Sequence, residues 1–446
     1  MRGSDDMLQW LSLLGHSVED LDSLNTIHVA GTKGKGSTCA FAASFLKAHR
    51  SETGSPKKIG LYTSPHMRHV RERIRINGEP ISEEYFATRF FEIWDKLPAQ
   101  ATPILDIPRY LQLLALLSFH VFIEENVDVA IYEAHMGGEF DATNIIKRPT
   151  VSVVTSIAMD HVELLGPTIA NIAWHKAGIF KPGSLAFSAP QEETVAIVLQ
   201  QRAFEKKIVL EFVDADSAFP TELRAIKPRV QMTNCSLALA AVRAWQVSAE
   251  VPSLTDGSIT RTIEQFVWPG RFQQINEGKY HWFLDAAHNE YSVQHAVKWF
   301  SDMTTDHRGN SFSLRRVLIF AHFSKRDGEA ILDKIAESLQ EHKIQVGHVI
   351  LTSYDERKDG QTRIDRNMNN RFSKEVLDRY AKTWEKSDPA AAIYQERTIE
   401  EALFRAREIG DASNGIQALI TGSLHLVSGA LNLLESEQGR ILPAHY

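Results

Sequence analysis

The chain has 446 residues, of which 43% are hydrophobic and 24% are charged, as is usual for a soluble globular protein of two or three domains. The formal net charge of −7 argues against a nucleic-acid partner, because basic surfaces bind phosphate backbones. No apolar run approaches the roughly 18 residues of a membrane-spanning helix. Cys39 and Cys235 are too few for a disulfide framework. Without signal- or transit-peptide character at the N-terminus, we expect a cytoplasmic monomer with no membrane partner.

The first half of the chain alternates short β-branched runs with helical patterns. Strands are predicted over 26–30, 59–62, 127–132 and 151–157, and helices over 37–48, 82–97 and 109–125. Strands that alternate with helices predict a parallel, doubly wound α/β sheet.

A domain boundary is predicted at 268–271, because Pro269-Gly270 interrupts the chain after a helical pattern over 259–266. The alternation then resumes, with strands predicted over 281–284, 317–320, 348–351 and 418–421. We therefore expect a first domain over 1–267, a linker over 268–275, and a smaller Rossmann-like α/β domain over 276–446. The charged segment 354–373 is interpreted as a solvated loop.

A glycine-rich loop connects the first predicted strand to the first predicted helix. It consists of Gly31, Thr32, Lys33, Gly34, Lys35, Gly36 and Ser37. Glycines let backbone N–H groups turn toward phosphate oxygens, and the helix N-terminus adds a partial positive charge. Lys35 is placed to neutralise the phosphates of ATP and Ser37 to hold Mg²⁺. The strict motif has a glycine where this chain has Val29, so the first domain is predicted to be P-loop ATPase-like with a shortened loop. The density of glycines disfavours the alternative, an ordinary turn.

Polar residues follow three further predicted strands. Ser64, Glu133 and the pair Asp160-His161 each come at a carboxyl end, where open α/β sheets bind ligands. Oxygen donors suit Mg²⁺, so the set predicts a metal site, although each residue taken singly is more often a surface or capping residue. Lys176 lies in a predicted helical segment, and the sequence alone favours its interpretation as an exposed helix lysine.

Two polar segments of the second domain also follow strands. They are 285–289 and 422–425, and each is a candidate for binding substrate or for ordinary loop chemistry. Arg271, after the Pro-Gly pair, is a candidate phosphate clamp or an interdomain salt bridge.

Together these motifs resemble the folylpolyglutamate synthase and dihydrofolate synthase family of the wider Mur-ligase group, and its eukaryotic branch in particular. The likeness covers nearly the whole chain. Its motifs are HVAGTKGKGST (28–38), TSPHM (63–67), VRERIRINGEPIS (70–82), GGEFDATNII (137–146), DHVELLGPT (160–168), IAWHKAGIFK (172–181), PGRFQ (269–273), DAAH (285–288) and TGSLHLVSG (421–429).

The resemblance implies an ADP-forming ligase that uses ATP to join L-glutamate to a folate through an acyl phosphate, with two Mg²⁺ ions and K⁺ as candidate cofactors. The implied nucleotide-binding residues are Gly31, Thr32, Lys33, Gly34, Lys35, Gly36, Ser37, Asn234, Arg271 and Asp285. The implied metal ligands are Ser37, Ser64, Glu133, His161 and a carbamylated Lys176. The implied catalytic residues are Lys35, Glu133, His161, Lys176, Asp285 and His288. The residues implied to face the acid and amine substrates are His66, Arg73, His135, His288 and Ser423.

Some positions depart from the family pattern. His135 and Ala286 replace glycines, Val230 replaces a histidine, and the chain begins after a helical segment that eukaryotic relatives carry. These departures leave open a paralogue that joins another carboxylic acid to another amino acid or amine. A third hypothesis is a non-catalytic regulator that binds a ligand. It is disfavoured because the charged residues implied for catalysis are all present.

Overall fold

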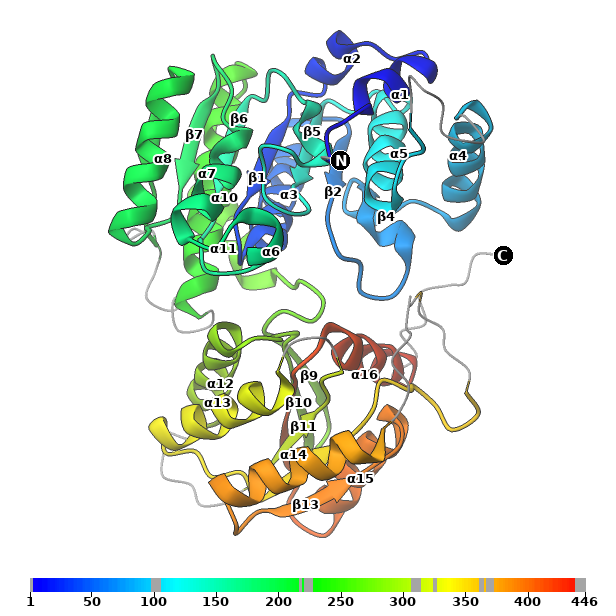
Figure 1. Ribbon diagram of the computed structural model, residues 1–446, viewed down its shortest axis with the longest axis vertical. Coiled ribbons are helices and arrows are strands. Elements are labelled where there is room, and N and C mark those ends of the chain that lie inside the picture. Colours follow the sequence, from blue (N-terminus) through cyan, green and yellow to red (C-terminus); the bar gives the residue numbers. More distant parts are fainter. Residues whose placement is uncertain are drawn as a thin grey trace. The chain divides into compact units, whose positions relative to one another are not determined.

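The computed structural model describes residues 3–97, 106–215, 219, 228–305, 314–323, 327–360, 365 and 373–437. The chain divides into two compact units (Figure 1). The first comprises Met1–His66 and Arg71–Phe266, and the second comprises Met67–Val70 and Val267–Tyr446. Among the described helices, none is long and apolar enough to cross a membrane.

The first unit is built on an eight-stranded sheet in the order β4-β3-β2-β5-β1-β6-β7-β8. Its strands are β1 (Ile27–Ala30), β2 (Ile59–Tyr62), β3 (Ile74–Ile76), β4 (Glu79–Pro80), β5 (Val129–Glu133), β6 (Val151–Val154), β7 (Leu185–Ser188) and β8 (Leu210–Phe212). The six strands from β2 to β8 in this order are parallel, whereas β3 and β4 form an antiparallel edge. β1 lies between β5 and β6, so the loop that follows it lies at the middle of the sheet.

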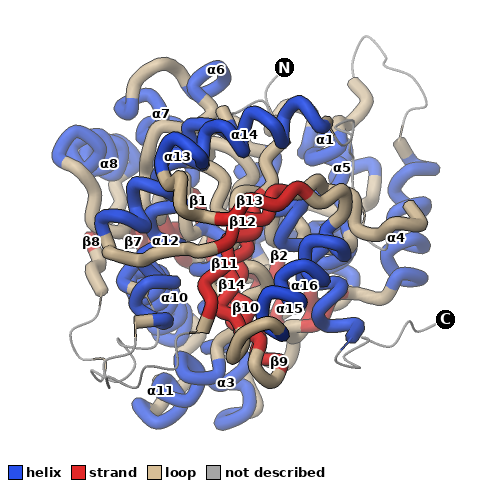
Figure 2. Tube along the Cα trace, turned by 90° about the horizontal axis from the view of Figure 1, so that it is seen from below, coloured by secondary structure: helices blue, strands red, loops and turns tan. Residues whose placement is uncertain are grey.

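Helices cover both faces of this sheet. They are α1 (Met7–Leu13), α2 (Val18–Asp22), α3 (Lys35–Thr53), α4 (Glu83–Lys96), α5 (Tyr110–Glu124), α6 (Val162–Leu165), α7 (Ile169–Lys176), α8 (Glu193–Lys206), α10 (Arg229–Ser248) and α11 (Asp256–Gln265), with 3₁₀ turns η1 (Val70–Arg73), η2 (Ala142–Ile145) and η3 (Ala177–Ile179). Helices α3, α10 and α11 lie on one face and α5, α7 and α8 on the other (Figure 2). Every residue of β1 and β5 is therefore buried, which explains their continuous apolar character.

The second unit has a six-stranded sheet in the order β13-β12-β11-β14-β10-β9. Its elements are β9 (Gln273–Glu277), β10 (Tyr280–Leu284), α12 (Glu290–Thr304), β11 (Arg315–Phe320), α13 (Gly328–Glu341), β12 (His348–Leu351), α14 (Lys374–Ser387), β13 (Ala392–Gln395), α15 (Ile399–Asp411), β14 (Ile416–Thr421) and α16 (Leu424–Glu437). All pairs are parallel except β9 with β10. Helices α12, α13 and α14 pack on one face and α15 and α16 on the other, each over its own apolar core (Figure 2).

The predicted fold class is confirmed in both units. Two of the predicted segments differ from the structure. The strand predicted over 151–157 ends at Val154, because the next residues turn toward the glycine-rich loop. The interpretation of 354–373 as solvated is wrong at its start. Tyr354 and Glu356 are 4% and 3% exposed, and Glu356 accepts a 2.7 Å hydrogen bond from Asn432. Residues 361–364 and 366–372 lie outside the described residues.

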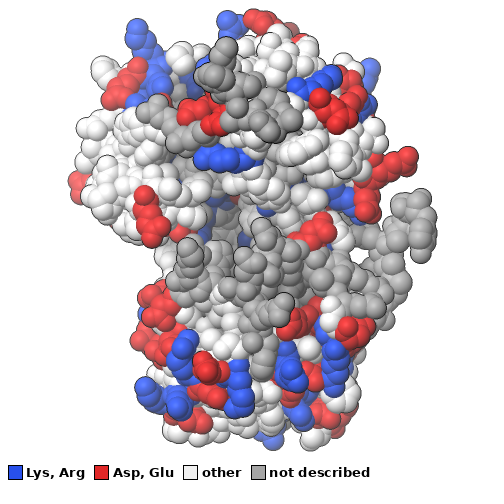
Figure 3. Space-filling model, turned by 45° about the vertical axis from the view of Figure 1, so that its right-hand side comes forward, with Lys and Arg blue, Asp and Glu red and all other residues white. Residues whose placement is uncertain are grey.

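Acidic and basic side chains are interspersed on the surface of the second unit, in the lower part of Figure 3. Short ion pairs account for part of this mixing, for example Lys374 with Asp378 and Arg405 with Glu408. Mixed charge of this kind keeps a surface soluble without creating a strong field of one sign.

Candidate nucleotide and ligation site

The glycine-rich loop leaves the carboxyl end of β1, and α3 begins at Lys35. Gly31 has φ 142° and Gly34 has φ 91°, both in the region that favours glycine. A Cβ atom at Gly31 would lie 1.9 Å from Oγ1 of Thr155. Both glycines are therefore required by the local backbone. The first turn of α3 supplies the N–H groups that make a helix N-terminus a site for anions.

The loop is tied to the segment that follows β6. The backbone N–H groups of Thr32 and Lys33 donate to the carbonyl of Ser156 at 2.9 and 3.3 Å. The Thr32 hydroxyl donates to the carbonyl of Ala158 and accepts from its N–H, both at 3.1 Å. Lys33 Nζ lies 3.3 Å from a carboxylate oxygen of Asp160. The glycine-rich loop and the segment after β6 are thus held together by backbone hydrogen bonds, side-chain hydrogen bonds and an ion pair.

Two lysine side chains converge on one carbonyl oxygen of the loop. Nζ of Lys176 donates to the oxygen of Gly31 at 2.7 Å, and Nζ of Lys35 donates to it at 3.2 Å. Lys176 is 3% exposed, so its interpretation as an exposed helix lysine is wrong. Burial, aided by the charge of Lys35, lowers the pKa of Lys176 well below its ordinary value. The neutral amine is thereby favoured, and this is the form that reacts as a nucleophile.

Ser64 and Glu133 meet because β2 and β5 are adjacent parallel strands. The backbone N–H of Ser64 donates to a carboxylate oxygen of Glu133 at 2.9 Å, and Glu133 is 4% exposed. Arg73, itself buried, donates to the Ser64 hydroxyl at 2.8 Å and to Nδ1 of His66 at 3.0 Å. The structure therefore brings four of the predicted site residues together at one end of the sheet.

His135 lies beside this group. Its Nε2 is 2.6 Å from the hydroxyl of Tyr62, and its Nδ1 is 3.5 Å from a carboxylate oxygen of Asp141. The carboxylate favours a proton on Nδ1, so the Tyr62 hydroxyl donates to Nε2. Burial lowers the pKa of His135 and Arg73 adds to the effect, while Asp141 opposes it. The His135 imidazole is therefore neutral, and each of its two nitrogens has a partner.

The remaining predicted residues of the first unit lie as follows. Ser37 is 6% exposed in the first turn of α3. His161 precedes α6 with φ 52°, its side chain is 45% exposed, and its Nε2 is 4.0 Å from a carboxylate oxygen of Asp160. Its role as a metal ligand stays a prediction.

Asn234 lies on α10 and its side chain lies against the glycine-rich loop. A Cβ atom at Gly34 would approach Oδ1 of Asn234 to 2.3 Å. The Asn234 amide also donates to the side chain of Gln231 at 2.9 Å. The packing of α10 on α3 thus brings a residue about 200 positions along the chain next to the loop.

In the second unit the two predicted segments lie side by side, because β10 and β14 are adjacent and parallel. The N–H of Gly422 donates to the carbonyl of Ala287 at 3.0 Å. The Asp285 carboxylate accepts from the N–H groups of Phe272 and Ala287, each at 3.0 Å. Burial raises the pKa of Asp285 from 3.8 to about 6, and the charge of Arg271 opposes the rise.

His288 and Ser423 complete the predicted set of the second unit. Nδ1 of His288 donates to the carbonyl of Ala286 at 2.9 Å. Ser423 is 5% exposed, and its hydroxyl accepts from the N–H of His425 at 3.1 Å. Ala286 adopts no positive φ, so alanine at this position is unstrained.

Sequence reasoning did not select two polar aromatic residues at the same end of this sheet, His322 and Tyr354. His322 is hydrogen-bonded through Nδ1 to the carbonyl of Gly422 at 2.8 Å. The Tyr354 hydroxyl accepts from the N–H of Phe323 at 2.8 Å, and its ring lies 5.1 Å from that of His425. His322 and Tyr354 shortly follow β11 and β12, so the strand-end rule that selected Asp285 also selects them.

No family model matches the chain. The chain is, however, similar to curated proteins and to solved structures. Folylpolyglutamate synthase of Neurospora crassa is 39% identical over 96% of this chain and 85% of its own length. The probable folylpolyglutamate synthase of Schizosaccharomyces pombe is 36% identical over 96% and 87%.

Among solved structures, Mycobacterium tuberculosis folylpolyglutamate synthase complexed with ADP and AMPPCP superposes with a TM-score of 0.74. It is 23% identical and covers 97% of this chain and 96% of that one. E. coli FolC in complex with DHPP and ADP gives 0.73 at 23% identity, over 98% and 94% of the two chains. Two α/β units with a glycine-rich loop after the central strand thus define a protein of the Mur ligase fold. More particularly, the chain belongs to the folylpolyglutamate synthase family.

Proposed function

We propose that this protein is an ATP-dependent ligase that adds L-glutamate to a folate through an acyl phosphate. The convergence of Lys35 and Lys176 on the loop carbonyl of Gly31, in a chain 39% identical to a folylpolyglutamate synthase, carries the proposal. A relative solved with ADP and AMPPCP supports ATP as the nucleotide.

ATP binds with its phosphates over the glycine-rich loop and the N-terminus of α3. Glycines at 31 and 34 permit the backbone conformation, and Lys35 neutralises the phosphates once ATP competes for its ammonium group. Asn234 lies against Gly34. We propose that it contacts the nucleotide base. Arg271 stays a candidate phosphate clamp of the second unit.

The residues near the loop fit Mg²⁺, for which two sites are proposed. Ser37 offers a hydroxyl, and Ser64 and Glu133 offer a second set of oxygen donors from adjacent strand ends. A carbamylated Lys176 would contribute a carboxylate, and its lowered pKa favours the amine that carbamylation requires. His161 and K⁺ remain proposals of the same kind. Bound Mg²⁺ would spread the negative charge that builds up on the transferred phosphate.

A carboxylate does not react directly with an amine, because it would have to expel oxide, which is a poor leaving group. ATP supplies a better leaving group. A substrate carboxylate attacks the γ-phosphate of ATP, ADP leaves, and an acyl phosphate forms. The amine of glutamate then attacks the acyl carbon and phosphate departs, so an amide forms and one proton is released. Lys35 stabilises the developing charge in the first step. Asp285, His288 and Ser423 are proposed to bind the amino acid.

His135 favours a second candidate function, in which the acid is not a folate. The buried imidazole is held by Tyr62 and Asp141, and it puts a polar ring where the family pattern has a glycine. Such a paralogue would join another carboxylic acid to an amino acid or amine.

One pair of experiments tests the proposal against this alternative. The gene is expressed in a strain that lacks folylpolyglutamate synthase, with a Lys35→Ala variant as the matched control. Growth restored only by the unchanged protein supports folate as the acid. If growth is not restored, while ADP formation in vitro depends on another acid and amine, the alternative replaces the first proposal.

The molecular context is also part of the proposal. We place the enzyme in the cytoplasm as a monomer that works on small molecules, without a nucleic-acid or membrane partner. Size-exclusion chromatography with light scattering tests the monomer, and a mass twice that of the chain would contradict it.

A further inference from the structure

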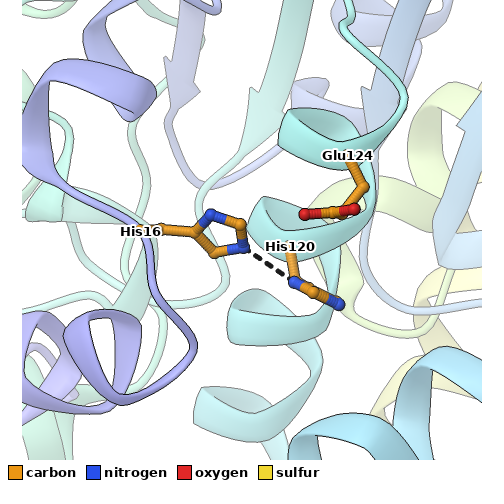
Figure 4. A group of neighbouring side chains, drawn as sticks. All are labelled: His16, His120 and Glu124. Atoms are coloured by element: carbon orange, nitrogen blue, oxygen red, sulfur yellow. Dashed lines mark hydrogen bonds between the residues drawn. The ribbon is translucent and has the colours of Figure 1, made fainter.

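Away from the glycine-rich loop, the first unit holds two histidines and a glutamate whose side chains converge (Figure 4). His16 lies between α1 and α2, whereas His120 and Glu124 lie one turn apart on α5. Nε2 of His16 is 2.7 Å from Nδ1 of His120. One ligand atom from each of the three residues lies within 4.8 Å of the other two.

The ring of His120 is oriented by a second carboxylate. Its Nε2 lies 3.3 Å from Oε2 of Glu92 on α4, and Arg89 holds the same Glu92 oxygen at 2.7 Å. Glu92 accepts a hydrogen bond from Nε2–H of His120, so Nδ1 presents its lone pair to His16 and Glu124. This carboxylate–histidine arrangement is the one that orients imidazole ligands in metal sites. The His120 side chain is 4% exposed, so its orientation is fixed by packing.

A hydrogen bond between two imidazoles accounts for the pair of rings alone. It does not account for a glutamate beside both rings and a second carboxylate behind one of them. Two imidazoles and the Glu124 carboxylate, with Glu92 behind one ring, are a donor set that a divalent ion would complete. Asp20 adds a further negative charge that acts on His16, while Lys96 opposes it.

The geometry points to a binding site for a divalent transition ion of the zinc class, with His16 Nε2, His120 Nδ1 and a Glu124 carboxylate oxygen as ligands. Imidazole selects such ions over Mg²⁺ and Ca²⁺, which prefer oxygen donors. Water would take the fourth position. Nitrogen ligands about 2.1 Å from a tetrahedral ion lie roughly 3.4 Å apart, so the two rings need to separate by less than about 1 Å.

The bound ion would cross-link the N-terminal segment to α5. His16 and His120 are 104 residues apart in the sequence, so their bridging restrains the chain over a long loop. An ion that binds the folded state alone raises the free energy of unfolding in proportion to the logarithm of its concentration. The site would therefore stabilise the first unit without taking part in ligation.

The test uses the full chain, freed of metal with a chelator and held in excess Mg²⁺ to occupy oxygen-donor sites. Zn²⁺ is titrated by calorimetry, and Co²⁺ is added separately because its visible absorption reports nitrogen ligands and tetrahedral geometry. We expect one equivalent of either ion to bind and the melting temperature to rise with Zn²⁺. The variants Glu124→Gln and His16→Gln should lose binding by at least about 100-fold, and Glu92→Ala should lose about 10–100-fold.

The control is His281→Gln, which removes a partly exposed histidine of the second unit. Glu124 is exposed and His16 partly so, and their variants are expected to fold, as circular dichroism will show. Zn²⁺ binding that is unchanged in Glu124→Gln and His16→Gln would overturn the proposal. Failure of the unchanged protein to take up Co²⁺ or Zn²⁺ would also overturn it, and would leave a hydrogen-bonded histidine pair only. Neither result bears on the proposed ligase activity.

Discussion

The Nζ atom of Lys176 lies 2.7 Å from the carbonyl oxygen of Gly31, inside the first unit and almost without exposure to solvent. A buried lysine next to the cation Lys35 is costly as an ammonium, which explains the lowered pKa of Lys176. A carbamate on this amine would replace the extra cation with an anion at the place where phosphates and Mg²⁺ are proposed to bind.

Replacement of Lys176 by alanine should lower ligase activity by about 100-fold or more, because one metal-binding carboxylate would be lost. Short carboxylates such as acetate, added to the assay, should restore part of it. The matched control is Lys181→Ala, another lysine that donates to a backbone carbonyl. Full activity in Lys176→Ala, or a loss that no carboxylate restores, would argue against carbamylation.

Replacement of Lys35 by alanine should reduce kcat by about 10²–10³-fold, because charge on the transferred phosphate would lose a fixed cation. ATP should also bind more weakly, as measured by calorimetry. Lys47→Ala lies on the exposed side of the same helix and serves as the control. An unchanged kcat in Lys35→Ala would place the chemistry away from this loop.

Replacement of His135 by alanine should raise KM for the acid substrate about tenfold, which corresponds to ~1.4 kcal/mol, while KM for ATP changes by less than about twofold. The His135 imidazole is hydrogen-bonded to Tyr62. The charge of Arg73, which donates to the Ser64 hydroxyl, acts on the same ring, and this is why the two constants should separate. Tyr62→Phe, which removes the hydroxyl partner of His135, should produce a smaller change of the same kind. Equal effects on both KM values would contradict this placement.

The second unit should lose stability as the pH rises from about 4 to about 6. Burial raises the pKa of Asp285 to about 6, so in this window the folded carboxyl keeps a proton that the unfolded chain releases. The free energy of unfolding then falls by ~3 kcal/mol at most and levels off above pH 6. Urea unfolding of wild type and Asp285→Asn at several pH values measures this effect.

The variant at position 285 cannot ionise, so its stability relative to wild type should rise across the same window. Asp302→Asn, which removes an exposed partner of Lys298, controls for general effects of charge. Parallel stability curves for wild type and Asp285→Asn would show that folding leaves the pKa of Asp285 unchanged.

Several elements of the fold could be predicted because their signals are local. The strand, loop and helix around Lys35 follow from apolar runs and glycines, and the structure reproduces them with α3 extended to Thr53. The edge strands β3 and β4 were missed, although Asn77-Gly78 between them is a hairpin signal, with φ 56° and 94°. Two- and three-residue strands carry too little periodicity to be noticed.

Other features depend on contacts between distant parts of the chain. The burial of Lys176 cannot be read from its helix, because the surface it meets is formed by Gly31, 145 residues earlier. The assignment of Met67–Val70 to the second unit rests on similar contacts. Arg68 pairs with Glu435 at 2.6 Å, and the Ser428 hydroxyl donates to the carbonyl of Met67.

Some functional residues could be predicted from local sequence patterns, whereas others depend on contacts between distant parts of the chain. Asp285 and Ser423 could be selected because polar residues after parallel strands gather at one edge of a sheet. The contact of Asn234 with Gly34 needs the packing of α10 on α3, which no local pattern reveals. The roles of these residues in catalysis stay predictions until the variants are measured.

The most direct measurement is mass spectrometry of the products formed from ATP, Mg²⁺, a tetrahydrofolate and L-glutamate by the purified protein. We expect folate products heavier by one or more glutamyl residues, with one ADP formed for each residue added, and at least about 100-fold less product with Lys35→Ala. A folded protein that binds ATP yet yields no glutamylated folate would contradict the proposed ligation of glutamate to a folate.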